Sequence, residues 1–307
     1  MSTSTAQPAV PSSSSAGALC VLAAAALWGS TGTVSTFAPA GVPAVVVGSS
    51  GLAIGGLLLY LTGRLAGAGP AARGRREYAL VVLGAATVAG YPLTFFPAVA
   101  RAGVAPGTVI MLCCAPVSAG LLDWLLRRHR PRRRWVLATA GCLAGAVLLA
   151  VGGDATAHLD PVGILLAVAA GASYAAYTAI AGLLISRGRG SAPVTGAMFG
   201  GGALLVLPLQ LAAGPAWMLH GHGPLVVAHL ALVTTFLAYV LYGRGLRTVT
   251  AAVATTLALA EPAVATVLGV LVLHERLAVA GWVGEALLGA ALLLLAVGQR
   301  APASTAP

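Results

Sequence analysis

The amino-acid sequence predicts an all-α integral membrane protein with ten transmembrane helices, arranged as two inverted five-helix repeats. Three observations support this fold class. The chain is 59% hydrophobic and 8% charged over 307 residues, which is too apolar for a water-soluble globule. It divides into ten long apolar runs separated by turn or charge signals. Its two halves also match each other at a fixed shift of 146 residues.

Each of the ten apolar runs is long enough to cross a bilayer with some tilt, because a transmembrane helix needs roughly 20 apolar residues. We therefore assign one transmembrane helix to each run, in chain order. The runs cover residues 18–37, 43–62, 78–100, 104–126, 135–151, 162–185, 194–211, 225–243, 251–273 and 278–297.

The repeats are predicted at residues 18–152 and 161–298, with a connecting loop at 153–160. Residues 1–17 are mainly Ser, Thr, Ala and Pro without charge, and residues 299–307 form a short C-terminal tail. The N-terminal stretch is expected to be disordered, because it has too little apolar surface to form a core. A cleaved signal peptide would carry a basic segment here, and this stretch has none.

The distribution of charge indicates topology. All 17 basic residues are arginines, and nearly all lie in short segments between the apolar runs. Because arginine accumulates in cytoplasmic loops, both termini are predicted in the cytoplasm, with Arg101 and Arg276 on the opposite side of a cytoplasmic (inner or plasma) membrane. The net charge of +10 therefore does not indicate nucleic-acid binding. Arg244 and Arg247 belong to this orientation signal, although they could also meet a substrate carboxylate.

The internal repeat has a functional implication. The shift places Pro116 on Pro262, Arg101 on Arg247 and Trp28 on Tyr174. Low-complexity apolar sequence matches itself by chance, so the matched prolines and arginines are the main evidence for the repeat. Because five spans is an odd number, the second repeat enters the membrane in the opposite sense. In transporters, such inverted repeats place the substrate site between them near the midplane and allow alternating access.

Glu261 and Pro262 lie about midway along the ninth run. A carboxylate at the bilayer centre costs on the order of 2.5–3.5 kcal/mol, so it usually faces a bundle interior or a water-filled cavity. Glu261 is therefore a candidate for binding a cationic group or a proton, and a structural acid is the alternative. Pro262 lacks an N–H, so we expect the Ala258 carbonyl to lose its helical partner and the helix to kink. Pro116 and Pro262 are candidate hinges or static bends.

Aromatic side chains with polar tips are candidates for lining a pocket for an organic substrate. They lie on the first, third, sixth and eighth runs as Trp28, Tyr91, Tyr174, Tyr177 and Tyr239. Aromatic residues near the ends of a span more often mark the membrane interface. Trp28, Tyr174 and Tyr177 lie near the middle of their runs, which favours a lining role. Tyr242 lies closer to an end and is expected at the interface.

Other features are read as structural. Glycine pairs four residues apart predict close helix packing, at Gly51/Gly55, Gly141/Gly145 and Gly196/Gly200. Asp123 is expected to pair with the neighbouring arginines. The four cysteines lie within apolar runs, so they are expected as core residues, with no disulfide, metal site or cofactor.

Several motifs resemble the EamA-type transporters of the drug/metabolite transporter superfamily, over nearly the whole chain. The matching residues are 26–29, 100–101 and 116–117 in the first half, and 237–242, 245–246, 250–252, 261–262, 275–277 and 284 in the second. The resemblance implies a ten-helix carrier with cytoplasmic termini that mostly exports amino acids and related metabolites. It also implies a peripheral tenth helix, in which Glu285 would serve packing or a dimer contact.

These observations predict a secondary transporter that exports a small organic metabolite, such as an amino acid, by alternating access. The first, third, fourth, sixth, eighth and ninth runs are expected to surround its cavity, and protons are a candidate coupling ion. Import of a metabolite and export of cationic drugs are alternatives. The sequence has no metalloprotease or serine-hydrolase motif, which argues against an enzyme. A channel would need charged rings or a filter loop. The substrate and the oligomeric state are left open.

Overall fold

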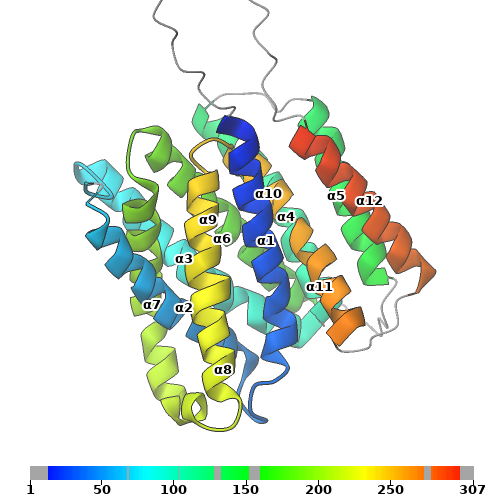
Figure 1. Cartoon of the computed structure of the whole chain (residues 1–307), viewed down its shortest axis with the longest axis horizontal. Helices are drawn as coiled ribbons and strands as arrows, with labels where there is room; N and C mark the ends of the chain where they lie inside the picture. The colour runs from blue at the N-terminus through cyan, green and yellow to red at the C-terminus, as the bar shows by residue number, and fades with distance from the viewer. Residues whose placement is uncertain are drawn as a thin grey trace, which may run out of the picture.

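The computed structural model describes residues 13–67, 69–102, 104–127, 133–151, 160–272 and 278–297. All regular structure in these ranges is helical, and the helices form one bundle (Figure 1). The elements are α1 (Ser13–Ser35), α2 (Ala44–Leu65), α3 (Arg75–Ala102), α4 (Val104–Arg127), α5 (Arg133–Val151), α6 (Pro161–Ser186), α7 (Ser191–Ala213), the 3-10 helix η1 (Pro215–Leu219), α8 (Gly223–Ala228), the π-helix η2 (His229–Leu237), α9 (Ala238–Gly245), α10 (Ala251–Leu257), α11 (Ala260–Val272) and α12 (Val279–Val297).

Seven described helical segments are long and apolar enough to cross a membrane, and they are accompanied by two shorter apolar helices, Gly107–Leu122 and Val279–Leu295. The all-helical membrane class is therefore confirmed, while the count of ten spans stays a prediction. The seven segments are Ser15–Ser35, Ala44–Leu65, Arg75–Ala102, Pro161–Ser186, Ser191–Ala213, Gly223–Gly245 and Ala251–Val272.

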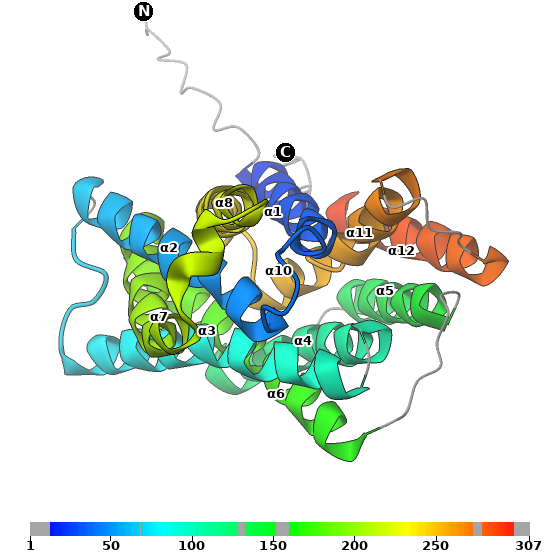
Figure 2. The ribbon, with the colours of Figure 1, turned by 90° about the horizontal axis from the view of Figure 1, so that it is seen from below.

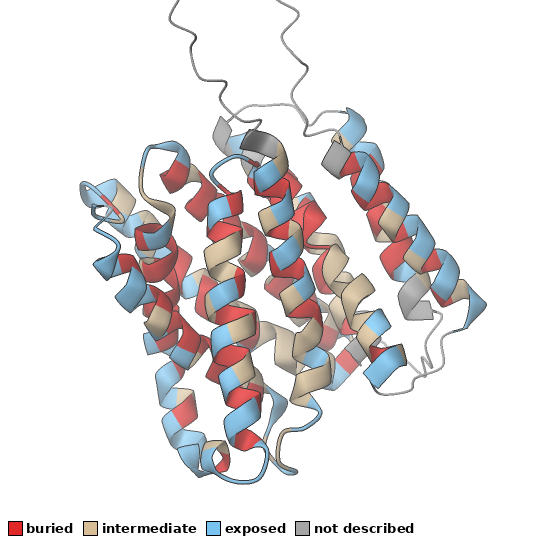
Figure 3. Ribbon diagram, viewed as in Figure 1, coloured by how far each residue is buried: buried red, intermediate tan, exposed pale blue. Residues whose placement is uncertain are grey.

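The outer surface of the bundle is apolar. Buried residues face the interior, and exposed residues follow the outer faces of the helices (Figure 3). Large apolar side chains stand on these outer faces, including Leu137, Leu165 and Leu204. A soluble monomer rarely exposes so much contiguous apolar surface. The outer faces are therefore suited to contact with lipid.

The N-terminal boundary of α1 differs from our prediction. The helix begins at Ser13, so residues 13–17, which we predicted as part of a disordered tail, are helical. Gly17 packs so closely against the turn after α9 that a Cβ atom would overlap the Thr248 side chain. This contact holds the start of α1 in place. Residues 1–12, 152–159 and 298–307, which include the rest of the predicted tails and nearly all of the predicted connecting loop, lie outside the described residues.

Most arginines at the ends of the described helices gather at one end of the bundle, and Arg101 at the end of α3 is an exception. α1 begins and α12 ends there, at the top of Figure 1. At the same end, α2 closes with Arg64, α5 opens with Arg133 and α9 carries Arg244 in its last turn. We call this the arginine-rich end.

Ion pairs join α3 and α6 at both ends. Near the arginine-rich end, Glu77 of α3 lies 3.4 Å from the Nε of Arg189, in the turn after α6. At the far end, the Nε of Arg101 lies 3.0 Å from a carboxylate oxygen of Asp160. The other oxygen of Asp160 caps α6 by accepting a hydrogen bond from the Val162 N–H. α3 and α6, which pack along their lengths, are therefore held in register.

The predicted ninth span is interrupted, as Pro262 suggested, but the details differ. α10 ends at Leu257 and α11 begins at Ala260. Our expectation that the Ala258 carbonyl lacks a partner is wrong, because it accepts a hydrogen bond from the Glu261 N–H at 2.9 Å. The chain tightens to a shorter turn before the proline, which satisfies that carbonyl. By contrast, α4 continues through Pro116 without a break.

The predicted glycine contacts are present. In α2, a Cβ at Gly55 would lie 2.5 Å from the carbonyl oxygen of Ala231 in η2. In α5, a Cβ at Gly145 would lie 2.8 Å from the carbonyl oxygen of Gly284 in α12. α5 and α12 form a pair at one edge of the bundle (Figures 1 and 2), which agrees with the peripheral position implied for the last helix.

We expect Gly145→Ala to destabilise the protein relative to Gly289→Ala. Both substitutions improve helix propensity equally, by about 1 kcal/mol. At Gly145 the new methyl group meets the backbone of α12, whereas nothing lies within 4 Å at Gly289. Overpacking of this kind costs about 1–3 kcal/mol. Thermal unfolding of the two purified variants measures the difference, and equal midpoints would contradict the packing of α5 on α12.

Candidate functional site

A cavity of about 600 Å³ lies inside the bundle. Its volume is in the range typical of small-molecule sites, about 300–1,000 Å³. Helices from both halves of the chain line it, namely α1, α2, α3, α4, α5, α6, α7, η2, α9 and α11. The expected ring of six spans is therefore incomplete, because α2, α5 and α7 also contribute. Glycines on α2, including Gly48 and Gly51, lie on the cavity wall, and they carry no chemical signal that would mark α2 as a lining helix.

Most of the predicted site residues meet at this cavity. Pro116 is not among its lining residues. The predicted residues that do line it are Trp28, Tyr91, Tyr174, Tyr177, Tyr239, Glu261 and Pro262. They come from five separate helices, so the fold brings together side chains that the sequence marked as candidates for independent reasons.

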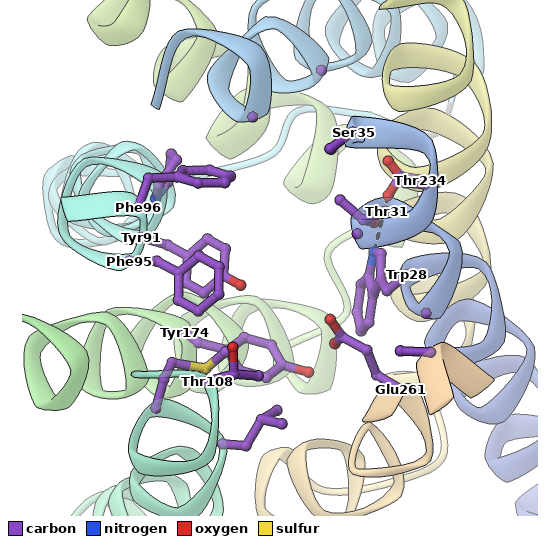
Figure 4. Close-up of a pocket in the computed structure, with 18 of the residues that line it drawn as sticks. Trp28, Thr31, Ser35, Tyr91, Phe95, Phe96, Thr108, Tyr174, Thr234 and Glu261 are labelled. Atoms are coloured by element: carbon purple, nitrogen blue, oxygen red, sulfur yellow. Dashed lines mark hydrogen bonds between the residues drawn. The ribbon is translucent and has the colours of Figure 1, made fainter. Parts of the chain in front are cut away.

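Glu261 lies in the first turn of α11, and its carboxylate points into the cavity beside the Trp28 ring (Figure 4). No hydrogen bond or ion pair joins this carboxylate to another residue in the described part of the chain. Tyr91, Tyr174 and Tyr239 line the same cavity. The position at the N-terminus of a helix favours a negative charge. The break before α11 thus presents an acidic group to the cavity, with no counter-ion from the described residues.

Trp28 is fixed from two sides. Its ring centroid lies 5.0 Å from that of Tyr239, 5.2 Å from Tyr242 and 6.2 Å from Tyr174. Its Nε1 donates a hydrogen bond of 2.9 Å to the Thr234 carbonyl in η2. A π-helix departs from the usual backbone bonding pattern and is frequent at functional sites. Trp28 and Tyr174, which correspond through the internal repeat, therefore meet at the centre of the bundle.

Tyrosine hydroxyls close the cavity toward the arginine-rich end. Tyr174 donates to the Tyr242 hydroxyl at 3.2 Å, and Thr178 bonds the same oxygen at 3.2 Å. The Tyr177 and Tyr239 hydroxyls are 2.8 Å apart. We call these five residues the tyrosine layer.

The predicted interfacial position of Tyr242 is wrong, since its side chain is only 2% exposed. The position of Tyr242 near the end of its apolar run does not indicate that its side chain is buried. The face of α9 that carries Tyr242 turns inward onto α1, where the Tyr242 ring contacts Trp28, and toward α6.

The cavity extends from the tyrosine layer away from the arginine-rich end. Its lining residues fall in the second half of α1, the first half of α2, the second half of α3 and the first half of α4. These halves all lie at the far end, because successive helices run in opposite directions (Figure 1). The arginine-rich end is thus separated from the cavity by packed, hydrogen-bonded side chains.

The sequence reasoning missed several lining residues. Phe95 and Phe96 follow Tyr91 by about one helical turn, and that spacing could have indicated them. The other missed lining residues have no sequence pattern that distinguishes them from the rest of their apolar runs. The missed residues with rings or hydroxyls are Thr31, Ser35, Phe95, Phe96, Thr108, Phe199, Thr234, Thr235 and Thr266. Arg244 borders a separate pocket of about 80 Å³, and the side chain of Asp123 lies outside the described residues.

Comparisons with known proteins agree with this architecture. The model of the EamA-like transporter family matches residues 15–151 and again residues 161–297. The uncharacterized transporter YwfM of Bacillus subtilis (strain 168) is 36% identical over 289 residues, covering 92% of this chain and 94% of YwfM. The uncharacterized inner membrane transporter YicL of Salmonella typhimurium is 27% identical over 228 residues, covering 73% of this chain and 74% of YicL.

A solved crystal structure shares the fold. It has a TM-score of 0.78 at 20% sequence identity and covers 92% of this chain and 97% of its own chain. The two family matches, one in each half, confirm the resemblance that the sequence motifs indicated. The chain therefore belongs to the EamA-like transporter family, and it is a multi-pass membrane transporter of a small molecule and not an enzyme.

Proposed function

We propose that this protein is a secondary transporter that exports a small organic metabolite across the cytoplasmic membrane by alternating access. The observation that carries the proposal is Glu261, whose carboxylate points into a cavity lined by both halves of the chain. Intramembrane acids are rare and usually mark a substrate or ion pathway. A site between two repeats near the midplane also suits a carrier of this kind.

We propose ten transmembrane helices, with repeats at residues 18–152 and 161–298. In this assignment α8, η2 and α9 together form the eighth span, and α10 and α11 form the ninth. Each repeat then has five spans, so the two repeats have opposite orientations. Pro262 lies just after the break in the ninth span and acts as a hinge. Pro116 holds the corresponding position in the fourth span, where the helix is continuous.

The arginine-rich end lies in the cytoplasm under the positive-inside rule, which puts both termini on that side. The cavity then faces the outside, and the tyrosine layer separates it from the cytoplasm. This arrangement is the outward-facing state of an alternating-access cycle, in which an exporter releases its substrate. Opening toward the cytoplasm requires separation of Tyr174 and Thr178 on α6 from Tyr242 on α9.

Glu261 is the group that we propose to couple transport to protons. Its carboxylate has no ion-pair partner among the described residues, so it can exchange a proton or a cationic group with the cavity. A proton bound from the outside and released to the cytoplasm would drive export of the substrate in the opposite direction. The neighbouring tyrosine hydroxyls supply hydrogen-bonding partners along the route.

Metabolite profiles of cells and medium test this function. Cells that overproduce the protein are expected to accumulate one metabolite selectively in the medium, and cells with Glu261→Gln are expected to lose this accumulation. Glu285→Gln is the matched control, because Glu285 lies in α12 and does not line the cavity. Depletion of a metabolite from the medium would instead indicate import. Identical profiles for the wild-type protein and Glu261→Gln would contradict the assignment of the site.

A further inference from the structure

One charged side chain, an acid, is found among the described residues that line the cavity. Glu261 is its acidic lining residue, and none of the described lining residues is arginine, lysine or histidine. Arg101, two residues after the lining residue Val99, is paired with Asp160 at 3.0 Å. Arg244 lies in the last turn of α9, beyond the tyrosine layer toward the arginine-rich end. Among the described lining residues, a ligand in the cavity therefore meets one negative charge and no positive side chain.

Aromatic rings form much of the wall around this charge. Trp28, Tyr91 and Tyr174 surround the space in front of the Glu261 carboxylate (Figure 4). The Tyr91 ring stacks on Phe95 at a centroid distance of 5.4 Å and an interplanar angle of 7°. Faces of aromatic rings attract cations, and the attraction is stronger when water is excluded. The aromatic rings and the Glu261 carboxylate therefore both favour a positively charged ligand.

Among the described lining residues, a carboxylate on the ligand would find no comparable partner. The polar lining groups include the hydroxyls of Thr31, Ser35 and Thr108, which cannot neutralise a charge (Figure 4). A helix N-terminus is often an anion site, but the first turn of α11 carries Glu261 itself. The Glu261 N–H is already bonded to the Ala258 carbonyl, and Pro262 has no N–H. An anionic group here would be desolvated beside another anion.

We infer that the cavity selects an organic cation, with one positive charge on an apolar body of aromatic size, and rejects ligands that carry a free carboxylate. The inference rests on the proposed role of the cavity as the substrate site, and it narrows the substrate from metabolites in general to amines and related monocations. A free amino acid is excluded by its carboxylate, although its ammonium group would match Glu261.

A set of three probes with one common body tests this selectivity. Phenethylamine, phenylalanine and 3-phenylpropionate share a phenylethyl group and carry net charges of about +1, 0 and −1 at neutral pH. Binding to the purified full-length protein is measured by equilibrium dialysis, with protein-free micelles as the blank. We expect phenethylamine to bind at least about 10-fold more tightly than phenylalanine, and 3-phenylpropionate more weakly still. Glu261→Gln removes one member of a desolvated charge pair, so it should weaken phenethylamine binding by roughly 30-fold or more.

The outcomes separate the inference from the proposed function. Glu285→Gln is expected to bind phenethylamine as the wild-type protein does. If phenylalanine binds more tightly than phenethylamine and Glu261→Gln weakens it, the substrate site stands and the cation selectivity is overturned. If phenethylamine binds equally to the wild-type protein and to Glu261→Gln, both the selectivity and the site are wrong. A folded protein that does not bind phenethylamine at millimolar concentration also overturns the inference.

Discussion

Replacing Glu261 with Gln is expected to reduce pH-gradient-driven transport in proteoliposomes to the level of protein-free liposomes. The carboxylate is the acidic group of the cavity wall, and it has no protein counter-ion among the described residues. Gln has nearly the same shape but cannot bind and release a proton. The transporter would keep its packing and lose the group through which a proton gradient acts. The measurement is the initial rate of substrate flux under an imposed pH gradient.

Two further variants separate charge from shape. Glu261→Asp retains a titratable carboxylate, so gradient-driven transport should persist at a reduced rate. Glu285→Gln changes an acid that is outside the cavity lining and should transport as the wild-type protein does. Undiminished gradient-driven transport by Glu261→Gln would show that the proton-coupling role is wrong.

Trp28→Ala is expected to have the largest effect on stability and to abolish substrate binding. Trp28 is 9% exposed, packs against three tyrosine rings and donates a hydrogen bond to the Thr234 carbonyl. Truncation of a buried tryptophan to alanine costs about 3–5 kcal/mol. It also removes the ring beside Glu261 from the cavity wall. Thermal unfolding and dialysis with phenethylamine measure the two effects separately.

Trp282→Ala is the matched control, because Trp282 is 52% exposed on the outer face of α12. This substitution should change neither the unfolding midpoint nor the binding of phenethylamine appreciably. Trp28→Phe keeps a ring at the site but leaves the Thr234 carbonyl without its donor, so we expect a smaller loss of stability, about 1–3 kcal/mol. A Trp28→Ala protein that unfolds at the wild-type midpoint and binds phenethylamine normally would contradict the packing around this residue.

The features that the sequence predicted well are those in which a residue conflicts with its surroundings. An acid and a proline in the middle of an apolar run identified Glu261 and the interruption of its helix, because both are costly in a membrane. Tyr174 and Tyr177, for which a position near the middle of a run favours a lining role, are buried and line the cavity. The matched prolines and arginines revealed two repeats before any structural comparison.

The sequence does not determine how each helix is rotated about its own axis. A run of Ala, Leu, Val and Gly has little difference between its faces, so it does not tell which side looks inward. Distance from the end of a run does not reveal this rotation either, so Tyr242, which is near an end, is expected at the interface although it is buried in the tyrosine layer. The contribution of α2 to the cavity was missed because its lining residues include Gly48 and Gly51.

Cysteine accessibility at Thr31 tests most directly whether this cavity is the transport site and opens away from the arginine-rich end. Thr31 lines the cavity on α1, and the four native cysteines can be replaced by alanine to provide a clean background. In right-side-out vesicles, we predict that a membrane-impermeant thiol reagent modifies Thr31→Cys, that bound phenethylamine slows the modification, and that the modified protein no longer transports. Absence of modification from the outside, or full transport after modification, would contradict the account.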